Sequence, residues 1–202
     1  MTGRKIEIIE KTAVFEGYFR IDRYRLRHSL HDGGMSREIV REVFERGHAA
    51  AVLPFDPVRD EVVMIEQFRI GAHAAGQDPW LTEIVAGIIE AGETVEDVAR
   101  REVREETGLM VTDLWPMAEY LVSPGGASEQ VTLFLGRVDS QDAEGVHGLD
   151  HEEEDIRVSP LPYRQAFDML SGGTINNAMT LIALQWLALN HDEVVMKWGH
   201  NL

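Results

Sequence analysis

Residues 87–109 read GIIEAGETVEDVARREVREETGL, and the order of apolar and acidic residues in this stretch is the most informative feature of the chain. On a helix that turns about 100° per residue, Val98 and its apolar neighbours share one face. Three carboxylates continue that face where further apolar residues would be expected: Glu102, Glu105 and Glu106. Like charges one turn apart repel, and a buried carboxylate without a partner is costly. A cation, either an arginine or a metal ion, is therefore expected against this helix.

The same stretch carries signals for the two ends of its helix, which is predicted over residues 94–107. Thr94 and Asp97 form a start that resembles a capping box, in which side chains accept hydrogen bonds from the first backbone N–H groups. Gly108 follows as the C-terminal stop, because glycine readily adopts the left-handed conformation that ends a helix.

The composition is that of a globular protein with an acidic surface. The chain has 202 residues, of which 44% are hydrophobic, enough for one large domain or for a domain with an extension. Acidic residues number 35 against 19 lysines and arginines, which gives a net charge of −16. Nucleic acids and anionic membranes are therefore not expected as partners. A polyanionic small substrate would need local arginines or a metal ion to overcome this field.

The absence of cysteine excludes disulfides and thiolate zinc sites, and it suits a reducing cytoplasm. The N-terminal sequence MTGRKIEIIE lacks the apolar core of a signal peptide. The longest apolar run, residues 179–189, is too short to span a bilayer. We therefore expect a cytoplasmic protein.

Alternation of apolar and polar residues favours strands over much of the chain. Residues 1–46 are predicted to form an antiparallel β region, because residues 19–30 alternate and a His-Asp-Gly-Gly turn follows them. Residues 47–202 are predicted to form the main domain. Its strands are expected at residues 49–54, 62–68, 80–85, 131–138 and 156–159, and further helices at residues 164–170 and 177–190. This order of elements favours an α/β sandwich with a mixed sheet.

The acidic helix and the loop before it fit the Nudix box, Gly-x5-Glu-x7-Arg-Glu-U-x-Glu-Glu-x-Gly-U, in which U is a bulky aliphatic residue. All nine defined positions match: Gly87, Glu93, Arg101, Glu102, Val103, Glu105, Glu106, Gly108 and Leu109. The chain therefore resembles the Nudix hydrolases, which cleave nucleoside diphosphates linked to another moiety. The resemblance implies the Nudix α/β/α sandwich with a mixed sheet, preceded here by the N-terminal antiparallel β region.

The acids of the box have the chemistry of a magnesium site. Carboxylate oxygens select Mg²⁺, with Mn²⁺ as a possible substitute, and such ions bridge to the phosphates of a substrate. Glu102 and Glu106 are the expected metal ligands, and the resemblance adds the backbone carbonyl of Ala86. Glu105 and Arg101 belong to the expected catalytic group. The alternative is a solvated charged helix, but the acids replace the apolar face instead of lying opposite to it.

Three residues of the box are expected to support the site. Gly87 allows the tight loop before the helix, and Gly108 ends the helix. Glu93 is expected to brace the loop together with Arg101, so that the metal-binding acids are oriented by neighbours that do not touch the metal.

A second acidic cluster, HEEED at residues 151–155, lies in a glycine-containing stretch just before a predicted strand. Such a run is usually a solvated loop. In the ADP-ribose pyrophosphatase branch of the Nudix family, however, a loop glutamate outside the box supplies the general base, and a nearby acid helps to bind metal. The resemblance assigns these roles to Glu152 and Glu154, with Glu153 as the alternative for either.

The resemblance to this branch extends from about residue 6 to residue 186. It includes a Ser-Pro-Gly-Gly loop that begins at Ser123, and it implies an ADP-ribose substrate. Arg69, at the end of a predicted strand, is expected to bind the phosphates, since a guanidinium group binds them through two nitrogens. In this branch an aromatic residue and an arginine from two subunits of a homodimer hold the adenine. Tyr18 and Arg41 occupy the matching positions, although Tyr18 is equally compatible with a place in the core.

The predicted reaction is the Mg²⁺-dependent hydrolysis of ADP-ribose to AMP and ribose 5-phosphate. One alternative is another substrate of the same family, such as a GDP-sugar, NADH or a dinucleoside polyphosphate, because the box recognises phosphate and metal rather than the attached group. The other alternative is a non-catalytic nucleotide sensor, since a fold alone does not determine function.

Overall fold

The structure, a computed structural model, describes residues 3–199 of the chain. The chain divides into two compact units. The first comprises residues 1–48 and 120–131, and the second comprises residues 49–119 and 132–202. Within the described chain, none of the helices combines the length and the apolar character that crossing a bilayer requires.

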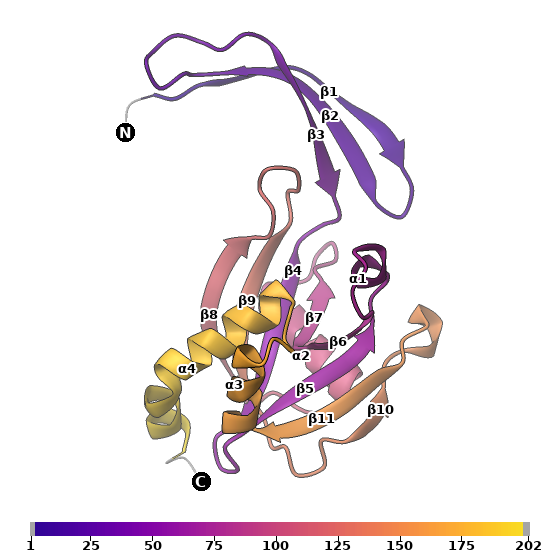
Figure 1. The fold of residues 1–202 in the computed structure, drawn as a ribbon, viewed down its shortest axis with the longest axis vertical. Helices are drawn as coiled ribbons and strands as arrows, with labels where there is room; N and C mark the ends of the chain where they lie inside the picture. Colours follow the sequence, from indigo (N-terminus) through magenta and orange to yellow (C-terminus); the bar gives the residue numbers. More distant parts are fainter. Residues whose placement is uncertain (1–2, 200–202) are drawn as a thin grey trace. The chain divides into compact units, whose positions relative to one another are not determined.

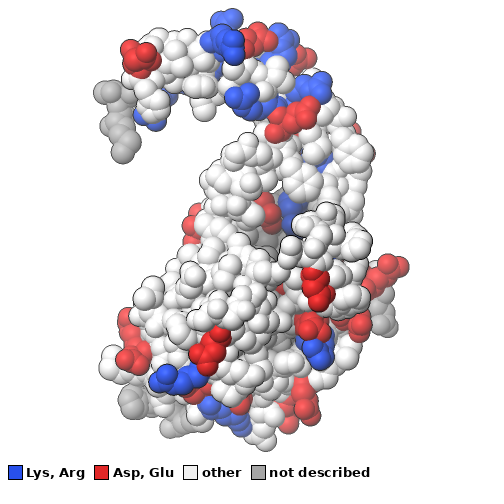
Figure 2. All heavy atoms as spheres, in the orientation of Figure 1, with Lys and Arg blue, Asp and Glu red and all other residues white. Residues whose placement is uncertain are grey.

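The first unit contains a three-stranded antiparallel sheet, as the sequence predicts for this region. Its strands, in spatial order, are β1 (Ile6–Glu16), β2 (Arg20–His28) and β3 (Ile39–Glu45). Arg25 of the central strand pairs with Glu10 of β1 at 2.8 Å and with Glu38 at 2.7 Å. Figure 2 shows basic and acidic side chains interleaved over these strands. Cross-strand ion pairs of this kind keep a highly charged face of the small sheet in register.

The main sheet has eight strands, and the longest path through it runs in the order β10-β11-β5-β4-β9-β8 (Figure 1). Off this path, β6 pairs with β5 and β7 pairs with β4, both antiparallel. The sheet as a whole is mixed. The strands are β4 (Ala49–Asp56), β5 (Glu61–Phe68), β6 (Trp80–Glu83), β7 (Val85–Ile88), β8 (Asp113–Leu121), β9 (Gln130–Arg137), β10 (Gly145–His147) and β11 (Ile156–Pro162).

Helices cover both faces of this sheet, which gives the predicted α/β/α sandwich. The α2 helix packs against β4 and β7, whereas α3 packs against β5 and β11, and α4 against β4 and α3 (Figure 1). Every residue of β4 is buried, because this strand lies between the two helical layers. The helical elements are α1 (Ile70–Ala74), α2 (Val95–Thr107), α3 (Tyr163–Ser171), α4 (Ala178–Trp198) and a short 3-10 helix at Asp150–Glu152.

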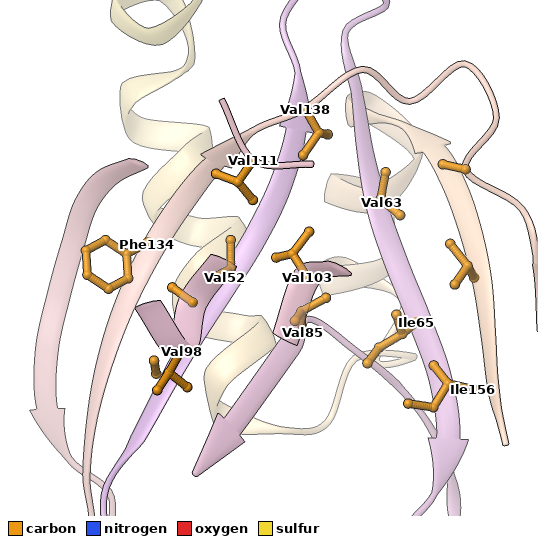
Figure 3. Close-up of a cluster of buried hydrophobic side chains, with 14 residues drawn as sticks. Val52, Val63, Ile65, Val85, Val98, Val103, Val111, Phe134, Val138 and Ile156 are labelled. Atoms are coloured by element: carbon orange, nitrogen blue, oxygen red, sulfur yellow. The ribbon is translucent and has the colours of Figure 1, made fainter. Parts of the chain in front are cut away.

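Under α2, the core is an apolar cluster, mostly of β-branched side chains, from β4, β5, β7, β9, β11 and the helix, with three residues from adjoining loops (Figure 3). Val52, Val63 and Val85 project from β4, β5 and β7, and they meet Val98 and Val103 of α2. All five are fully buried, so this face of the helix is fixed to the sheet by apolar burial. The acids that follow Val98 along the helix are therefore held at a defined place on the sheet.

The elements differ from the sequence predictions in three respects. The strand predicted at residues 80–85 is two strands, because the backbone N–H of Ile84 donates to Thr180 Oγ1 of α4 instead of to a neighbouring strand. The last helix continues eight residues beyond Asn190, to Trp198, whose indole nitrogen donates to Asp113 of β8 at 3.0 Å. The sequence analysis did not predict α1, β8 or β10.

The turn between β4 and β5 is organised by the buried carboxylate of Asp56. Its Oδ1 accepts from the backbone N–H groups of Val58 and Arg59, at 2.8 and 3.1 Å. Its Oδ2 accepts from Nη1 of Arg59 at 2.8 Å and from both N–H and hydroxyl of Ser140, at 3.0 and 3.1 Å. Burial alone would raise the pKa of Asp56, but these donors outweigh it and hold the pKa below its ordinary value.

Asp56→Asn should lower the free energy of unfolding by about 2–3 kcal/mol at pH 7, because an amide cannot accept all five hydrogen bonds. A depressed pKa contributes stability above the pKa of the unfolded state, and this contribution is lost as the pH falls through the folded-state pKa. The difference between the two proteins should therefore shrink below about pH 4. Urea unfolding of both proteins from pH 3 to pH 8 measures this difference in the free energy of unfolding. A difference that stays constant with pH would contradict this account.

Candidate active site

The acidic helix α2 has the ends and the buried face that its sequence predicts. Thr94 is its N-cap, and the Thr94 hydroxyl accepts from the backbone N–H of Asp97 at 3.2 Å. Gly108 ends the helix in the left-handed conformation, with φ of 72°. Glu106 lies on the face that also buries Val98, and only 2% of its surface is exposed. The buried face of the helix is therefore apolar at Val98 and carries a buried carboxyl group at Glu106, near its C-terminal end.

Arginine is the cation for two of the three helix acids. Nη1 of Arg101 donates to Glu102 at 2.7 Å and to Glu105 at 2.9 Å. Nε of the same guanidinium donates to Glu93 at 2.9 Å, and Glu93 in turn accepts from the backbone N–H of Glu90 at 3.0 Å. Arg101 and Glu93 thus connect the loop before the helix to the acids on the helix.

Glu106 lies outside this arginine network. Its Oε2 accepts from the backbone N–H of Ala86 at 3.3 Å. Burial raises the pKa of Glu106 well above its ordinary value, and the negative charges of Glu102 and Glu154 raise it further. Burial also raises the pKa of Glu102 to about 7, even though Arg101 opposes the shift. Two neighbouring buried carboxyl groups therefore hold their negative charge poorly unless another cation is added.

The place of Gly87 differs from the prediction. It lies in β7, opposite Ala50 of β4, rather than in the loop before the helix, and its φ is not in the left-handed region. A Cβ at this position would overlap the side chain of Glu102. A larger residue here would therefore have to displace the Glu102 side chain from its present place beside the strand. The conformational freedom that the loop needs is at Gly92, whose φ is 96°.

Arg69 stands at the end of β5, and its guanidinium has a partner that the sequence analysis did not identify. The backbone N–H of Arg69 donates to the carbonyl of Pro79 at 2.7 Å, and its Nε donates to Glu83 Oε2 at 2.7 Å. The charge of Arg69 lowers the pKa of Glu106, so the guanidinium lies on the side of the helix acids. Glu83 is buried, and its only signal in the sequence is an acid within an otherwise apolar strand.

The loop at residues 148–155 brings one of its glutamates towards the helix. Glu154 accepts from the backbone N–H of Leu149 at 3.2 Å, and its charge raises the pKa of both Glu102 and Glu106. Glu152 ends the short 3-10 helix with 56% of its side chain exposed, and its carboxylate lies 3.6 Å from Nε2 of His151. Glu154 is therefore close enough to affect the helix acids electrostatically, whereas the Glu152 side chain is largely exposed.

Glu153, the alternative for either loop role, has an unusual backbone. Its φ is 57°, a left-handed conformation that residues other than glycine rarely adopt. The turn at Glu153 separates the exposed Glu152 from Glu154, whose carboxylate folds back onto the loop.

The other residues expected to bind substrate belong to the first unit. Tyr18, in the turn between β1 and β2, is 88% exposed and is therefore not a core residue. Arg41 lies in β3 opposite Tyr24, and its Nη1 donates to the carbonyl of Val40 at 2.7 Å. The carbonyl of Ser123 accepts from Gly126 and Ala127, which closes the Ser-Pro-Gly-Gly loop as a tight turn.

Acidic side chains from two elements, α2 and the 148–155 loop, influence one another electrostatically, and β7 contacts the most buried acid of the helix through the N–H of Ala86. Among residues 3–199, no three acidic or histidine side chains are already arranged around a single point as metal ligands. Glu102 and Glu105 are both paired with Arg101.

Comparison with known proteins agrees with the geometry. The family model described as the NUDIX domain matches residues 45–174. The chain is 53% identical to an ADP-ribose pyrophosphatase of Escherichia coli K12 over 96% of this chain and 93% of that protein. It is 42% identical to an ADP-ribose pyrophosphatase of Haemophilus influenzae, over 96% and 90%. It is 34% identical to a GDP-mannose pyrophosphatase of Enterobacter sp. 638, over 92% and 96%.

A solved structure described as an ADP compounds hydrolase has the same fold. The TM-score is 0.67 at 20% sequence identity, and the match covers 92% of this chain and 96% of that one. The family model and the relatives both extend over most of the chain, including the acidic helix and the strands beneath it. The chain belongs to the Nudix family.

Proposed function

We propose that the protein hydrolyses the pyrophosphate bond of ADP-ribose to give AMP and ribose 5-phosphate, in a reaction that depends on Mg²⁺. The observation that carries this proposal is the buried carboxyl group of Glu106, which lies close to the charges of Glu102 and Glu154. A structural core has no use for such a cluster, whereas a diphosphate hydrolase needs it to hold cations. The substrate is supported by the names of the relatives that are 53% and 42% identical.

The residues present fit a magnesium ion. The carboxylates of Glu102, Glu106 and Glu154 and the backbone carbonyl of Ala86 are the hard oxygen donors that Mg²⁺ prefers, with Mn²⁺ as a possible substitute. When bound, the metal would neutralise phosphate oxygens and stabilise charge on the leaving phosphate. The raised pKa values of Glu102 and Glu106 support this assignment, because a divalent cation would relieve the cost of ionising both groups.

The protein's own residues would perform the remaining steps. Arg69 would hold the substrate phosphates through its Nη atoms, since Glu83 already occupies Nε. Arg101 would keep Glu102 and Glu105 in place through its two ion pairs. Glu152 would take the proton of the attacking water, and its exposed position on the loop leaves the carboxylate free to meet solvent.

We further propose that residues 1–46 form a dimerisation region and that residues 47–202 form the hydrolase domain. In β1, all eleven residues are exposed, including Ile6, Ile8 and Phe15, which are 71%, 50% and 57% exposed. A small sheet with such a surface is a natural contact for a second copy of the chain. The exposed Tyr18 and the guanidinium of Arg41 would then hold the adenine across the two subunits. Light scattering of the purified chain measures its mass in solution.

The Ser123 loop would complete the substrate contacts of this region, and its tight turn supports that role. A cytoplasmic location, expected of a chain without cysteine, is part of the same proposal. Hydrolysis of a GDP-sugar is the second candidate, because the GDP-mannose pyrophosphatase relative is 34% identical, a weaker similarity.

The function is tested by incubating the purified chain with ADP-ribose and Mg²⁺ and measuring the AMP formed. We expect turnover that stops on addition of excess EDTA and returns with Mg²⁺ or Mn²⁺. The same assay with GDP-mannose, NADH and diadenosine polyphosphates compares kcat/KM among substrates. If kcat/KM is higher for one of these compounds than for ADP-ribose, that compound is the preferred substrate. If ADP-ribose binds but is not hydrolysed, the protein is a nucleotide sensor.

Glu106→Gln should abolish the effect of Mg²⁺ on thermal stability and lower kcat more than about 100-fold, because the metal site loses an anionic ligand. Without metal at pH 8, the variant should melt no lower than the wild type. A glutamine can still accept from the N–H of Ala86 and does not have to ionise in a buried place. Melting curves with Mg²⁺ and with EDTA make this comparison. A Mg²⁺-dependent rise in Tm equal to that of the wild type would remove Glu106 from the metal ligands.

Glu152→Gln should lower kcat by about 10²-fold or more while Mg²⁺ is still bound, because only the general base is lost. Glu154→Gln should instead weaken Mg²⁺ binding, so that its activity recovers at higher Mg²⁺. Glu153→Gln is the matched control from the same loop, and it should change neither property by more than a few-fold. Rates measured over a Mg²⁺ titration separate the three variants, and a larger loss in Glu153→Gln than in Glu152→Gln would transfer the role of base to Glu153.

A further inference from the structure

Gln67 in β5 is a buried polar residue to which the reaction above gives no role. Only 7% of its surface is exposed, and its amide nitrogen Nε2 has no hydrogen-bond partner among the described residues. Buried polar atoms without partners are uncommon in folded proteins, because each loses its hydrogen bonds to water without replacement. The buried amide nitrogen of Gln67 therefore needs a hydrogen-bond acceptor from outside the described part of the chain, such as a bound ligand.

The position of Gln67 on the sheet shows where such a partner would lie. Ile65 belongs to the apolar cluster under α2, and side chains of a strand alternate between its two faces. Gln67 and Arg69 therefore follow Ile65 on the face that carries the helix acids. In the pairing of β5 with β6, Ile65 lies opposite Glu83, the buried acid that holds Nε of Arg69. Gln67 is thus placed between the apolar core and the proposed phosphate-binding arginine.

The chemistry of this amide selects the class of partner. Nε2 is a donor and carries no charge, so it suits an anionic oxygen and does not attract a cation. A half-turn about the last side-chain bond exchanges the two ends of the amide, so the donor can reach a ligand without backbone movement. Next to Arg69, whose Nε is already occupied, an uncharged donor would add a contact to the same anion.

We propose that Gln67 is a substrate-binding residue that donates a hydrogen bond from Nε2 to a phosphate oxygen of the diphosphate, beside the guanidinium of Arg69. This inference rests on the proposed function, because it takes the diphosphate as the ligand. It accounts for a polar group that lowers the stability of the ligand-free fold, since the hydrogen bond is made only when substrate is bound.

The test is the substitution Gln67→Met, which keeps an unbranched side chain of similar size and removes the amide. The probe is the non-hydrolysable α,β-methylene analogue of ADP-ribose, with its Kd measured by calorimetry in the presence of Mg²⁺. We expect Kd to rise about tenfold or more, the loss of one hydrogen bond to a charged group. Without ligand, the Tm should equal or exceed that of the wild type, because an unpartnered buried polar group has been removed.

Gln185→Met is the matched control, since Gln185 is exposed on α4 and α4 covers the opposite face of the sheet. It should leave Kd unchanged. Gln67→Leu is a second variant without the amide, and it keeps the test decisive if methionine disturbs the packing. An unchanged Kd in both Gln67 variants would overturn the inference, as would a loss of Tm with unchanged affinity, which would make Gln67 a structural residue. Failure of the wild type to bind the analogue or to hydrolyse ADP-ribose would instead overturn the proposed function.

Discussion

The guanidinium group of Arg101 is the contact on which the site depends. It binds three carboxylates, from Glu93, Glu102 and Glu105, at 2.7 to 2.9 Å. Without it, the two acids on the helix would repel their neighbours, and the loop before α2 would lose its link to the helix. One arginine thus compensates the charges on the accessible side of α2. Because Glu106 lies outside this network, the most deeply buried acid of the helix keeps an unmet need for a cation.

Arg101 pairs with two of the helix acids and leaves Glu106 without a cation, and this explains how an acidic helix can pack on the core of the fold. Val98 and Val103 secure the helix to the sheet by burial, while Glu106 at the end of the same face is destabilising unless it is protonated or meets a cation. Different residues on neighbouring turns of one helix therefore serve stability and chemistry. A site that costs stability in the free protein is also one that gains stability when its ligand binds.

The helix and its acids were predictable from the sequence because their signals are local. Capping by Thr94, the left-handed Gly108 and the change from apolar to acidic residues all lie within one short stretch, and helical periodicity relates them directly. Glu83 and Gln67 gave no such signal, because their importance comes from the pairing of β5 with β6. The loop glutamates are adjacent in sequence. Only the turn at Glu153 reveals that Glu154 faces the helix while Glu152 faces solvent.

Residues with a local sequence signal and residues placed by strand pairing have different chemical roles in the proposed reaction. The helix and its loop supply carboxylates, which bind cations, and such cations bridge to phosphates whatever group is attached to them. The end of β5 supplies Gln67, with Arg69 directly after it, and these are the two residues proposed to contact the diphosphate. The first unit supplies Tyr18, the exposed aromatic side chain suited to a purine. Under the proposed function, the box would carry the reaction, and discrimination among nucleotide substrates would fall to residues outside the box.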